Sequence, residues 1–246
     1  NKPYGMSVHG GGSESTGSST SRVKAKFDSY LHLNFFLPEL AARVGAEKLY
    51  TVHRLDRDTT GILLLTKTQP KAKELNRLFV ERQIQKKYLC ITKNTPDVRE
   101  GIIDIPIELG YIKMGNVKRE RMVLCPEPME DIRAQRRPSA TARRAITRYR
   151  VLGESGNAAL IEVEPETGIK HQIRVHLGFG LRCPVLGDHK YSNLDCMTPQ
   201  RLPSDILMRL KVRQQKARYV PMHLHSFQCM IPQAGPNGTN VFIRAP

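Results

Sequence analysis

Apolar residues recur at helical spacing in four segments of the chain. In the second of these segments Pro70 occupies the first turn, a position that proline favours, and Ala72, Leu75 and Leu78 share one face. The spacing of apolar residues therefore predicts helices at residues 27–40, 70–82, 171–177 and 204–216.

Runs of alternating or continuous apolar residues predict strands in the rest of the chain. These runs lie at residues 62–66, 88–92, 101–109, 145–152, 158–165 and 223–231. Strands outnumber helices and do not alternate with them regularly. This order favours an α+β fold with a central mixed, largely antiparallel sheet and flanking helices over a doubly wound parallel fold.

The length of the chain fits one domain, so we expect residues 1–246 to form a single unit with two lobes at most. A Gly/Ser-rich stretch at residues 10–21 predicts a flexible loop. The composition of residues 126–144 predicts an exposed basic loop. This loop is either a solvent-exposed connection with no further role or a phosphate-binding loop. The arginines that would hold phosphate are Arg136, Arg137, Arg143 and Arg144.

The charge balance indicates a polyanionic partner. Lys and Arg number 39 against 23 Asp and Glu, a formal net charge of +16 with a sequence pI near 9.9. Basic residues gain affinity for nucleic acid by releasing counterions from its phosphates, so we expect an RNA or DNA partner. No apolar run approaches the roughly 20 residues that cross a bilayer, and no basic amphipathic helix favours a membrane surface.

The cysteines indicate a reducing compartment. The 5 cysteines are scattered without a CxxC pair, which argues against a secreted disulfide scaffold. The sequence opens at Asn1 without an initiator Met, so we expect a fragment whose targeting peptide lies upstream.

Three polar stretches are candidates for chemistry. Asp56 lies in a charged turn directly before an apolar run, where a rigid element can hold a carboxylate; a salt-bridged turn is the alternative. A helix after Gly168 would present His171 and Arg174 on one face, and their alternative is a structural role. The third stretch, Pro184–Tyr191, is a polar turn that is structural by default.

Two other kinds of site are excluded by context. The run His9–Gly12 is similar to the oxyanion loop of lipases, but the chain contains no G-x-S-x-G nucleophile elbow. The histidine pairs His171 with His176 and His223 with His225 have no third ligand at zinc-like spacing. We therefore expect neither a lipase-like hydrolase nor a metal site.

At these motifs the sequence resembles the RluA-type RNA pseudouridine synthases. HRLDRDTTGILLLTK is similar to the family motif that carries the nucleophilic aspartate, and GIKHQIRVHL and PVLGDHKY are similar to its second and third signatures. NKPYGMSVHG, KKYLCIT and HLHSF resemble further family motifs in the same order. GIKHQ and GDHKYS most resemble an animal mitochondrial branch of the family.

The resemblance implies a pseudouridine-synthase-like fold with a basic active-site cleft and three catalytic residues. It makes Asp56 the nucleophile, Arg174 the cation that pairs with it, and Tyr88 the ring that stacks on the target base. Arg54 would fill the gap that an extruded uridine leaves in the RNA. Around these groups we expect further RNA contacts from His53, Lys170, His171 and Gln172.

One departure from the family pattern lies in the second signature. Where the family has Gly-Arg-Thr-His-Gln, this chain has Ile169 and Lys170 between Gly168 and His171. A guanidinium and a hydroxyl are therefore missing, and local RNA contacts are expected to differ.

The resemblance implies an isomerase that uses no cofactor and acts on structured RNA in the mitochondrial matrix. Ribosomal RNA, that of the mitochondrial large subunit above all, is the expected substrate, with tRNA and mRNA as alternatives and a ribosomal assembly intermediate as a further partner. A non-catalytic RNA-binding assembly factor that retains the fold is the rival hypothesis. The presence of all three expected catalytic residues, Asp56, Tyr88 and Arg174, argues against that rival.

Overall fold

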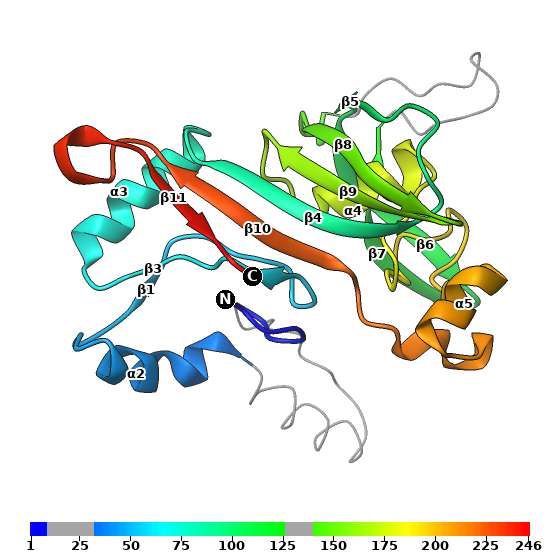
Figure 1. Cartoon of the computed structure of the whole chain (residues 1–246), viewed down its shortest axis with the longest axis horizontal. Coiled ribbons are helices and arrows are strands. Elements are labelled where there is room, and N and C mark those ends of the chain that lie inside the picture. Colours follow the sequence, from blue (N-terminus) through cyan, green and yellow to red (C-terminus); the bar gives the residue numbers. More distant parts are fainter. Residues whose placement is uncertain (9–31, 126–139) are drawn as a thin grey trace. The chain divides into compact units, whose positions relative to one another are not determined.

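The computed structural model describes residues 1–8, 32–125 and 140–246. These residues divide into two compact units (Figure 1). The first unit contains Asn1–Ile84 and Cys229–Pro246, and the second contains Gln85–Gln228.

The first unit combines two helices with short strands around one apolar cluster. Its elements are α2 (Leu33–Arg43), β1 (Tyr50–Thr51), β2 (Thr60–Gly61), β3 (Leu65–Thr66), α3 (Gln69–Val80), the 3-10 turn η4 (Pro236–Gly238) and β11 (Val241–Arg244). Strands β1 and β3 pair antiparallel, and α3 buries Ala72, Leu75 and Leu78 against Val52 and Ile62. The predicted helix at 70–82 is confirmed.

The predicted strand at 62–66 is wrong over most of its length. Only Leu65–Thr66 form a strand, because the backbone N–H of Leu64 donates to the side chain of His53 (Leu64 N to Nε2, 2.8 Å) and leaves the sheet ladder. The first predicted helix begins later than expected, at Leu33, and its residues 27–31 lie outside the described part of the chain.

The second unit is built on an antiparallel sheet. The strands of the unit are β4 (Gln85–Lys93), β5 (Glu100–Asp104), β6 (Ile107–Met114), β7 (Val117–Leu124), β8 (Ile146–Ser155), β9 (Ala158–Pro165) and β10 (Leu224–Ile231). Strands β6 and β7 form a separate two-stranded sheet. The strand order is β10-β4-β9-β8-β5, and the pairs β4–β9, β9–β8 and β8–β5 are antiparallel (Figure 1). The last three residues of β10, Cys229–Ile231, belong to the first unit. Strands β11 and β2 of that unit pair with β10. The expected α+β fold with a largely antiparallel sheet is confirmed.

Two sequence predictions in this unit need correction. The predicted strand at 101–109 is two strands, since Pro106 has no N–H to continue a ladder. Strand β6 then turns back at Gly115, which has a φ of 58°, and pairs with β7, a strand that we did not predict.

A helical segment packs against one face of this sheet. Helix α4 (Gln172–Val175) continues as the π-helix η2 (His176–Gly180), and Ile173 and Leu177 pack against Val151, Ile161 and Val163 of the strands. The predicted helix at 204–216 divides into α5 (Ser204–Leu210) and the 3-10 helix η3 (Gln214–Tyr219), because Lys211 adopts the left-handed conformation with φ 53°.

Candidate active site

Asp56 occupies a tight turn in the first unit. The carbonyl of Asp56 accepts the N–H of Thr59 at 3.2 Å, and the flanking Leu55 and Thr59 are buried. Asp56 itself is half-buried, while Arg54 is exposed. The turn is therefore anchored by its neighbours in the core, and it presents the carboxylate at the surface of the unit.

Lys2 is buried and donates a hydrogen bond to the backbone of this turn. Only 3% of Lys2 is exposed, and its ammonium Nζ donates to the carbonyls of Met6 and Arg57 at 2.8 Å and of Pro3 at 3.1 Å. Its backbone exchanges two hydrogen bonds with Gly61, at 2.7 and 3.1 Å. Burial lowers the pKa of Lys2 to about 8, against the opposing fields of Asp58 and Asp56. A buried cation thus lies next to the candidate nucleophile.

Replacing Lys2 tests how firmly the turn must be held. Lys2→Met keeps the apolar stem but removes the donor from three carbonyls, so we expect the free energy of unfolding to fall by about 1–3 kcal/mol and turnover to fall with it. The control is Lys67→Met, since the ammonium of Lys67 is exposed and donates to a single carbonyl, that of Val44. Equal losses in the two variants, measured by urea denaturation, would contradict the anchoring role.

His53 has a structural contact in the same unit. Its Nε2 accepts the N–H of Leu64 at 2.8 Å, and its ring stacks on Phe79 with centroids 4.6 Å apart. These contacts orient the strand segment that follows the Asp56 turn. An RNA contact from His53 stays a prediction.

The other two predicted catalytic residues lie in the second unit. Tyr88 is in β4 opposite Val163, and its partly buried ring packs against the sheet core. Arg174 is in the short helix α4 and is 9% exposed.

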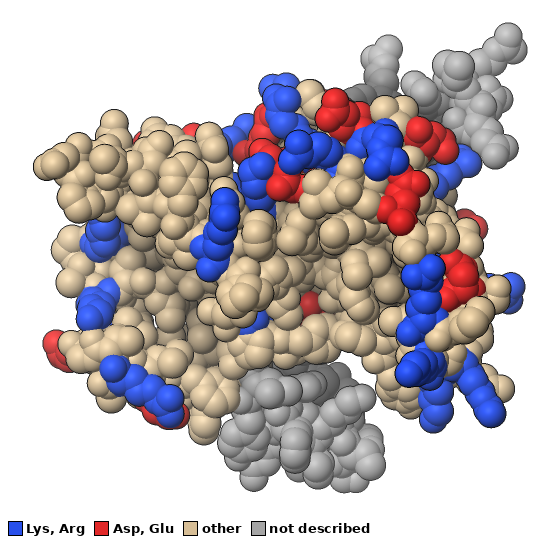
Figure 2. All heavy atoms as spheres, viewed as in Figure 1, with Lys and Arg blue, Asp and Glu red and all other residues tan. Residues whose placement is uncertain are grey.

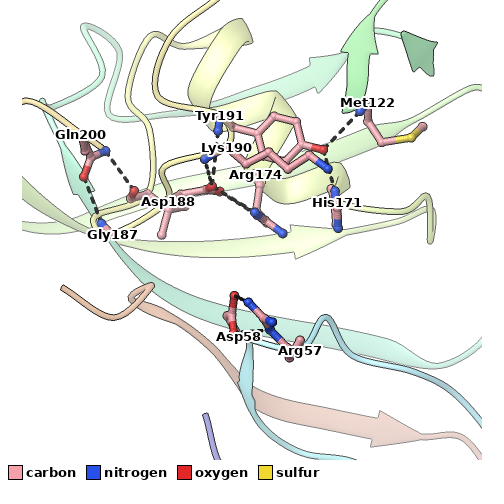
Figure 3. Close-up of polar contacts among 11 residues, drawn as sticks. Arg57, Asp58, Met122, His171, Arg174, Gly187, Asp188, Lys190, Tyr191 and Gln200 are labelled. Atoms are coloured by element: carbon pink, nitrogen blue, oxygen red, sulfur yellow. Dashed lines mark hydrogen bonds and ion pairs between the residues drawn. The ribbon is translucent and has the colours of Figure 1, made fainter. Parts of the chain in front are cut away.

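Arg174 forms a bidentate ion pair with Asp188 (Figure 3). Its Nε donates to Oδ2 at 2.6 Å and its Nη2 donates to Oδ1 at 3.0 Å, while the guanidinium lies 4.9 Å from the centroid of the Tyr191 ring. Oδ1 also accepts the N–H groups of Lys190 and Tyr191, at 3.1 and 3.3 Å. The side chain of Asp188 is 1% exposed, so this is a buried, geometrically fixed pair.

The turn that carries Asp188 depends on Gly187. Gly187 has a φ of 82°, and a Cβ there would lie 2.1 Å from the carbonyl oxygen of Pro221. Its N–H donates to Gln200 Oε1 at 3.0 Å. Only glycine fits this close approach, which explains the Gly-Asp dipeptide.

His171 joins the same network through Tyr191. Its Nδ1 and the hydroxyl of Tyr191 form a 2.5 Å hydrogen bond, and that hydroxyl also accepts the N–H of Met122 at 3.2 Å. Burial, reinforced by the nearby charge of Arg174, lowers the pKa of His171 to about 2. His171 is therefore neutral at physiological pH.

The depressed pKa of His171 makes stability depend on pH. An unfolded histidine takes up a proton near pH 6.5 while the folded one does not, so this stabilisation is present above pH 6.5 and is lost as the pH falls below it. Between pH 7.5 and 5.0 we expect His171 to remove up to about 2 kcal/mol from the free energy of unfolding. His171→Asn, which tolerates the left-handed backbone at φ 57°, should show a flatter pH dependence in urea denaturation. Identical curves for the two proteins would rule this out.

Gln172 has structural contacts inside the second unit. Its Oε1 accepts from Thr167 Oγ1 and Ile169 N, at 2.7 and 3.0 Å, and its Nε2 donates to Ile146 O and Thr147 Oγ1, both at 2.9 Å. Gln172 is 3% exposed, so every polar position of its amide is used inside the unit. These contacts give it a structural role, and an RNA contact from Gln172 stays a prediction. Lys170 is exposed, as an RNA contact requires, and its role stays a prediction.

Two of the four arginines in the predicted phosphate-binding loop can be located. Arg136 and Arg137 lie outside the described residues. Arg143 is exposed and forms a backbone bridge with Ile107, and Arg144 pairs with Asp104 at 3.2 Å. Its charge is therefore partly compensated by a carboxylate.

Sequence reasoning gave no individual role to Lys2, Asp188 or Tyr191, although all three lie in motifs that resemble those of the family. The sequence features that could have indicated these residues are a lysine directly before Pro3, and an Asp and a Tyr three residues apart after Gly187. Within residues 1–8, 32–125 and 140–246, no group of three or more His, Cys, Asp and Glu side chains has an arrangement that would hold a metal ion. The helices in these ranges are all too short or too polar to cross a membrane.

Comparisons with known proteins agree with the motifs. The model of the RNA pseudouridylate synthase family matches residues 1–178. The human protein named "Pseudouridylate synthase RPUSD4, mitochondrial" is 41% identical over 240 residues, which cover 96% of this chain and 59% of that protein. Its mouse counterpart is 40% identical over 244 residues, covering 96% and 59%. The chain thus spans about three fifths of the length of these relatives.

A solved structure extends the similarity to the fold. The structure of "Human RNA Pseudouridylate Synthase Domain Containing 4" matches with a TM-score of 0.81 at 38% identity, covering 100% of this chain and 83% of that one. The matched family region includes Asp56, Tyr88 and Arg174. By sequence and by fold, the chain belongs to the RNA pseudouridylate synthase family.

Proposed function

We propose that this chain isomerises uridine to pseudouridine in RNA, with Asp56 as the nucleophile. The observation that carries the proposal is the half-buried Asp56 carboxylate, presented on a turn that the buried Lys2 holds, in a chain of this family. A carboxylate in such a turn is positioned before substrate arrives, which is what a nucleophile needs.

The reaction requires few groups. The N1–C1′ bond of uridine breaks, the uracil turns, and a C5–C1′ bond forms while C5 loses a proton and N1 gains one. Oxidation state and phosphate esters are unchanged, so we propose that the enzyme uses no cofactor. One ionised Asp in a water-poor pocket, with a group to move the proton, is sufficient in principle.

Arg174 is proposed to orient and neutralise Asp56. Its pair with Asp188 uses the Nε–H and one N–H of Nη2. Asp188 would thus fix the orientation of the Arg174 guanidinium. In this proposal the guanidinium in turn contacts the Asp56 carboxylate. In the same proposal Tyr88 stacks on the target base and Arg54 fills the space that the extruded uridine leaves.

Ribosomal RNA, in mitochondria, is the substrate we propose. The support is similarity to relatives whose names carry the word mitochondrial, together with a net charge of +16 that suits a large polyanion. A more distant mouse relative, 26% identical, is named "Mitochondrial mRNA pseudouridine synthase Rpusd3". Messenger RNA is therefore the alternative that an experiment must separate.

Pseudouridine mapping in cells with and without the protein tests this function. We expect specific sites in mitochondrial ribosomal RNA to disappear on deletion and to return with the wild-type protein. The Asp56→Asn variant should not restore them. Restored ribosome assembly by Asp56→Asn, with the sites still unmodified, would instead identify a non-catalytic assembly factor, and loss of sites only in mRNA would reassign the substrate.

A further inference from the structure

A basic surface lies in the second unit, at residues outside the family motifs of the sequence but in contact with one of them: Leu186 lies in the apolar cluster beneath it, and His189 Nε2 forms a 3.2 Å hydrogen bond with the carbonyl of Arg218. Between Arg201 and Tyr219 the chain carries six Lys or Arg residues and one Asp, a net charge of +5. All six cations are exposed. Lys and Arg side chains gather on the side of the molecule where α5 lies (Figure 2). The cations are Arg201, Arg209, Lys211, Arg213, Lys216 and Arg218, and with Tyr219 they define the α5–η3 surface.

The one acidic residue of this segment does not compensate these charges. Asp205 Oδ2 accepts the backbone N–H of Asn157 at 2.8 Å, and its Oδ1 accepts the side-chain amide of Asn157 at 2.9 Å. These bonds tie α5 to the turn between β8 and β9. Across the described ranges, none of the six cations forms an ion pair.

The exposed face of the sheet shows the opposite arrangement. Lys87 and Arg150 both pair with Glu162 at 3.1 Å, and Lys87 also reaches Glu164 at 2.7 Å. Arg148 pairs with Glu166 at 2.6 Å, and Arg99 pairs with Glu154. Such exposed pairs contribute little stability, but they cancel the field of the cations. The cations of the α5–η3 surface, which have no such acidic partners among the described residues, therefore keep their positive field.

The α5–η3 surface is also firmly supported. Leu202, Ile206 and Ala217 are buried in one apolar cluster beneath it. The amide of Gln214 accepts Leu202 N at 2.9 Å and donates to Gln200 O at 2.8 Å, which links the start of η3 to the segment before α5. The cations thus extend from a fixed backbone, which reduces the entropy lost when they bind.

An aromatic ring lies among these cations. Tyr219 is 71% exposed, and the ammonium of Lys216 lies 5.6 Å from its ring centroid. An exposed aromatic ring between basic side chains is the arrangement that binds single-stranded nucleic acid, since the ring stacks a base while the cations hold phosphates. Helix α5 has 7 residues and turns Ile206 into the core, and Met208, 74% exposed, is its one exposed large apolar side chain, which is too little to form an apolar face for a membrane.

We propose that the α5–η3 surface is a second RNA-binding site, which holds the phosphates of an unpaired segment and stacks one of its bases on Tyr219. The proposal rests on the proposed function only in taking RNA as the substrate. It assigns to this surface the recognition of RNA outside the target nucleotide, and therefore affinity rather than chemistry.

Two triple variants with the same change of charge test the site. In the first, Arg209, Arg213 and Lys216 become Gln; in the control, Arg99, Arg148 and Arg150 become Gln, so both lower the net charge by three. Each lost phosphate contact reduces the slope of log Kd against log salt by about 0.7–0.9. We expect the slope of the first triple to fall by about 2 in filter binding to a cognate RNA, and that of the control to change by much less. Equal slopes would overturn the proposal.

Tyr219 gives a test without a change of charge. Tyr219→Leu should weaken binding by about 5- to 150-fold, the range for one lost base stack, while Tyr219→Phe keeps it. Turnover at saturating RNA should be unchanged in both, because KM rises and kcat does not. Unaltered affinity in Tyr219→Leu, or binding of the surface to anionic vesicles or acidic protein but not to RNA, would refute the site. Wild-type protein that binds RNA through this surface without isomerising it would refute the proposed function and leave this site standing.

Discussion

Asp56→Asn is expected to lower tritium release from 5-tritiated uridine in RNA by at least about 10³-fold, the scale on which removal of a nucleophile acts. The substitution preserves the shape of the side chain and removes its negative charge and its nucleophilicity. The backbone bonds of the turn, from Thr59 N to Asp56 O and from Lys2 to the Arg57 carbonyl, do not involve the carboxylate. RNA affinity should therefore stay within a few-fold.

Asp58→Asn is the matched control for this result. It makes the same chemical change two residues away, where the carboxylate pairs with Arg57 at 3.0 Å and both side chains are partly exposed. Both aspartates act on the buried Lys2, so their electrostatic environment is similar. We expect Asp58→Asn to keep most of the activity. Normal turnover by Asp56→Asn, or equal loss in the two variants, would contradict the assignment of the nucleophile.

Asp188→Asn is expected to cost about 3–5 kcal/mol of stability, because it leaves the buried guanidinium of Arg174 without its counter-charge. The new amide also places a donor where Arg174 Nε already donates. Turnover should fall as well, since Asp188 is proposed to hold Arg174 towards Asp56. The control is Asp104→Asn, whose partner Arg144 is exposed and whose loss should cost no more than about 1 kcal/mol.

Two further variants separate orientation from charge at Arg174. Arg174→Lys retains a cation but loses the planar fork, so it should restore more of the stability than of the rate that Arg174→Ala removes. Double-mutant cycles of stability, Arg174→Ala with Asp188→Ala and with Asp56→Ala, measure each pairing. Additive losses in the first cycle would contradict the ion pair seen in the structure. Additive losses in the second would refute the proposed contact with Asp56.

Local sequence pattern was enough to predict the long strands and the second helix. In β8 and β9 apolar residues alternate with charged ones, at 148–151 and 161–164, and in β4 a continuous apolar run at 88–91 indicates a buried strand. In α3 the proline near the start and the buried Ala72, Leu75 and Leu78 specify both the boundary and the face. Each of these elements is decided by residues that are close in sequence.

Contacts between distant residues decided the parts that sequence did not predict. The strand expected at 62–66 is interrupted by a side chain eleven residues away, since His53 takes the N–H of Leu64. Strand β7 contains the exposed run Val117–Glu120, which has no apolar alternation, and it is held by its pairing with β6. No local pattern records either contact.

The candidate site shows the same division. Family motifs indicated Asp56, Tyr88 and Arg174, but not that Arg174 would be fixed by Asp188 or that Lys2 would support the Asp56 turn. The Arg-rich segment at 126–144 was predicted to bind phosphate because its charges are close together in the sequence. The cations of the α5–η3 surface are spread over two helices and the segments beside them, and the lack of acidic partners in the described part of the chain is seen only in the structure, by contrast with the paired charges elsewhere in the unit.

The conversion of uridine to pseudouridine by the purified chain is the measurement that tests the central claim most directly. Nucleoside analysis of a cognate RNA, incubated with wild-type protein and no added cofactor, should show pseudouridine appearing in the same amount as uridine disappears, with no change in RNA mass. Asp56→Asn protein should bind the same RNA and form none. Wild-type protein that binds this RNA stably and forms no pseudouridine, or Asp56→Asn protein that forms it at the wild-type rate, would contradict the account.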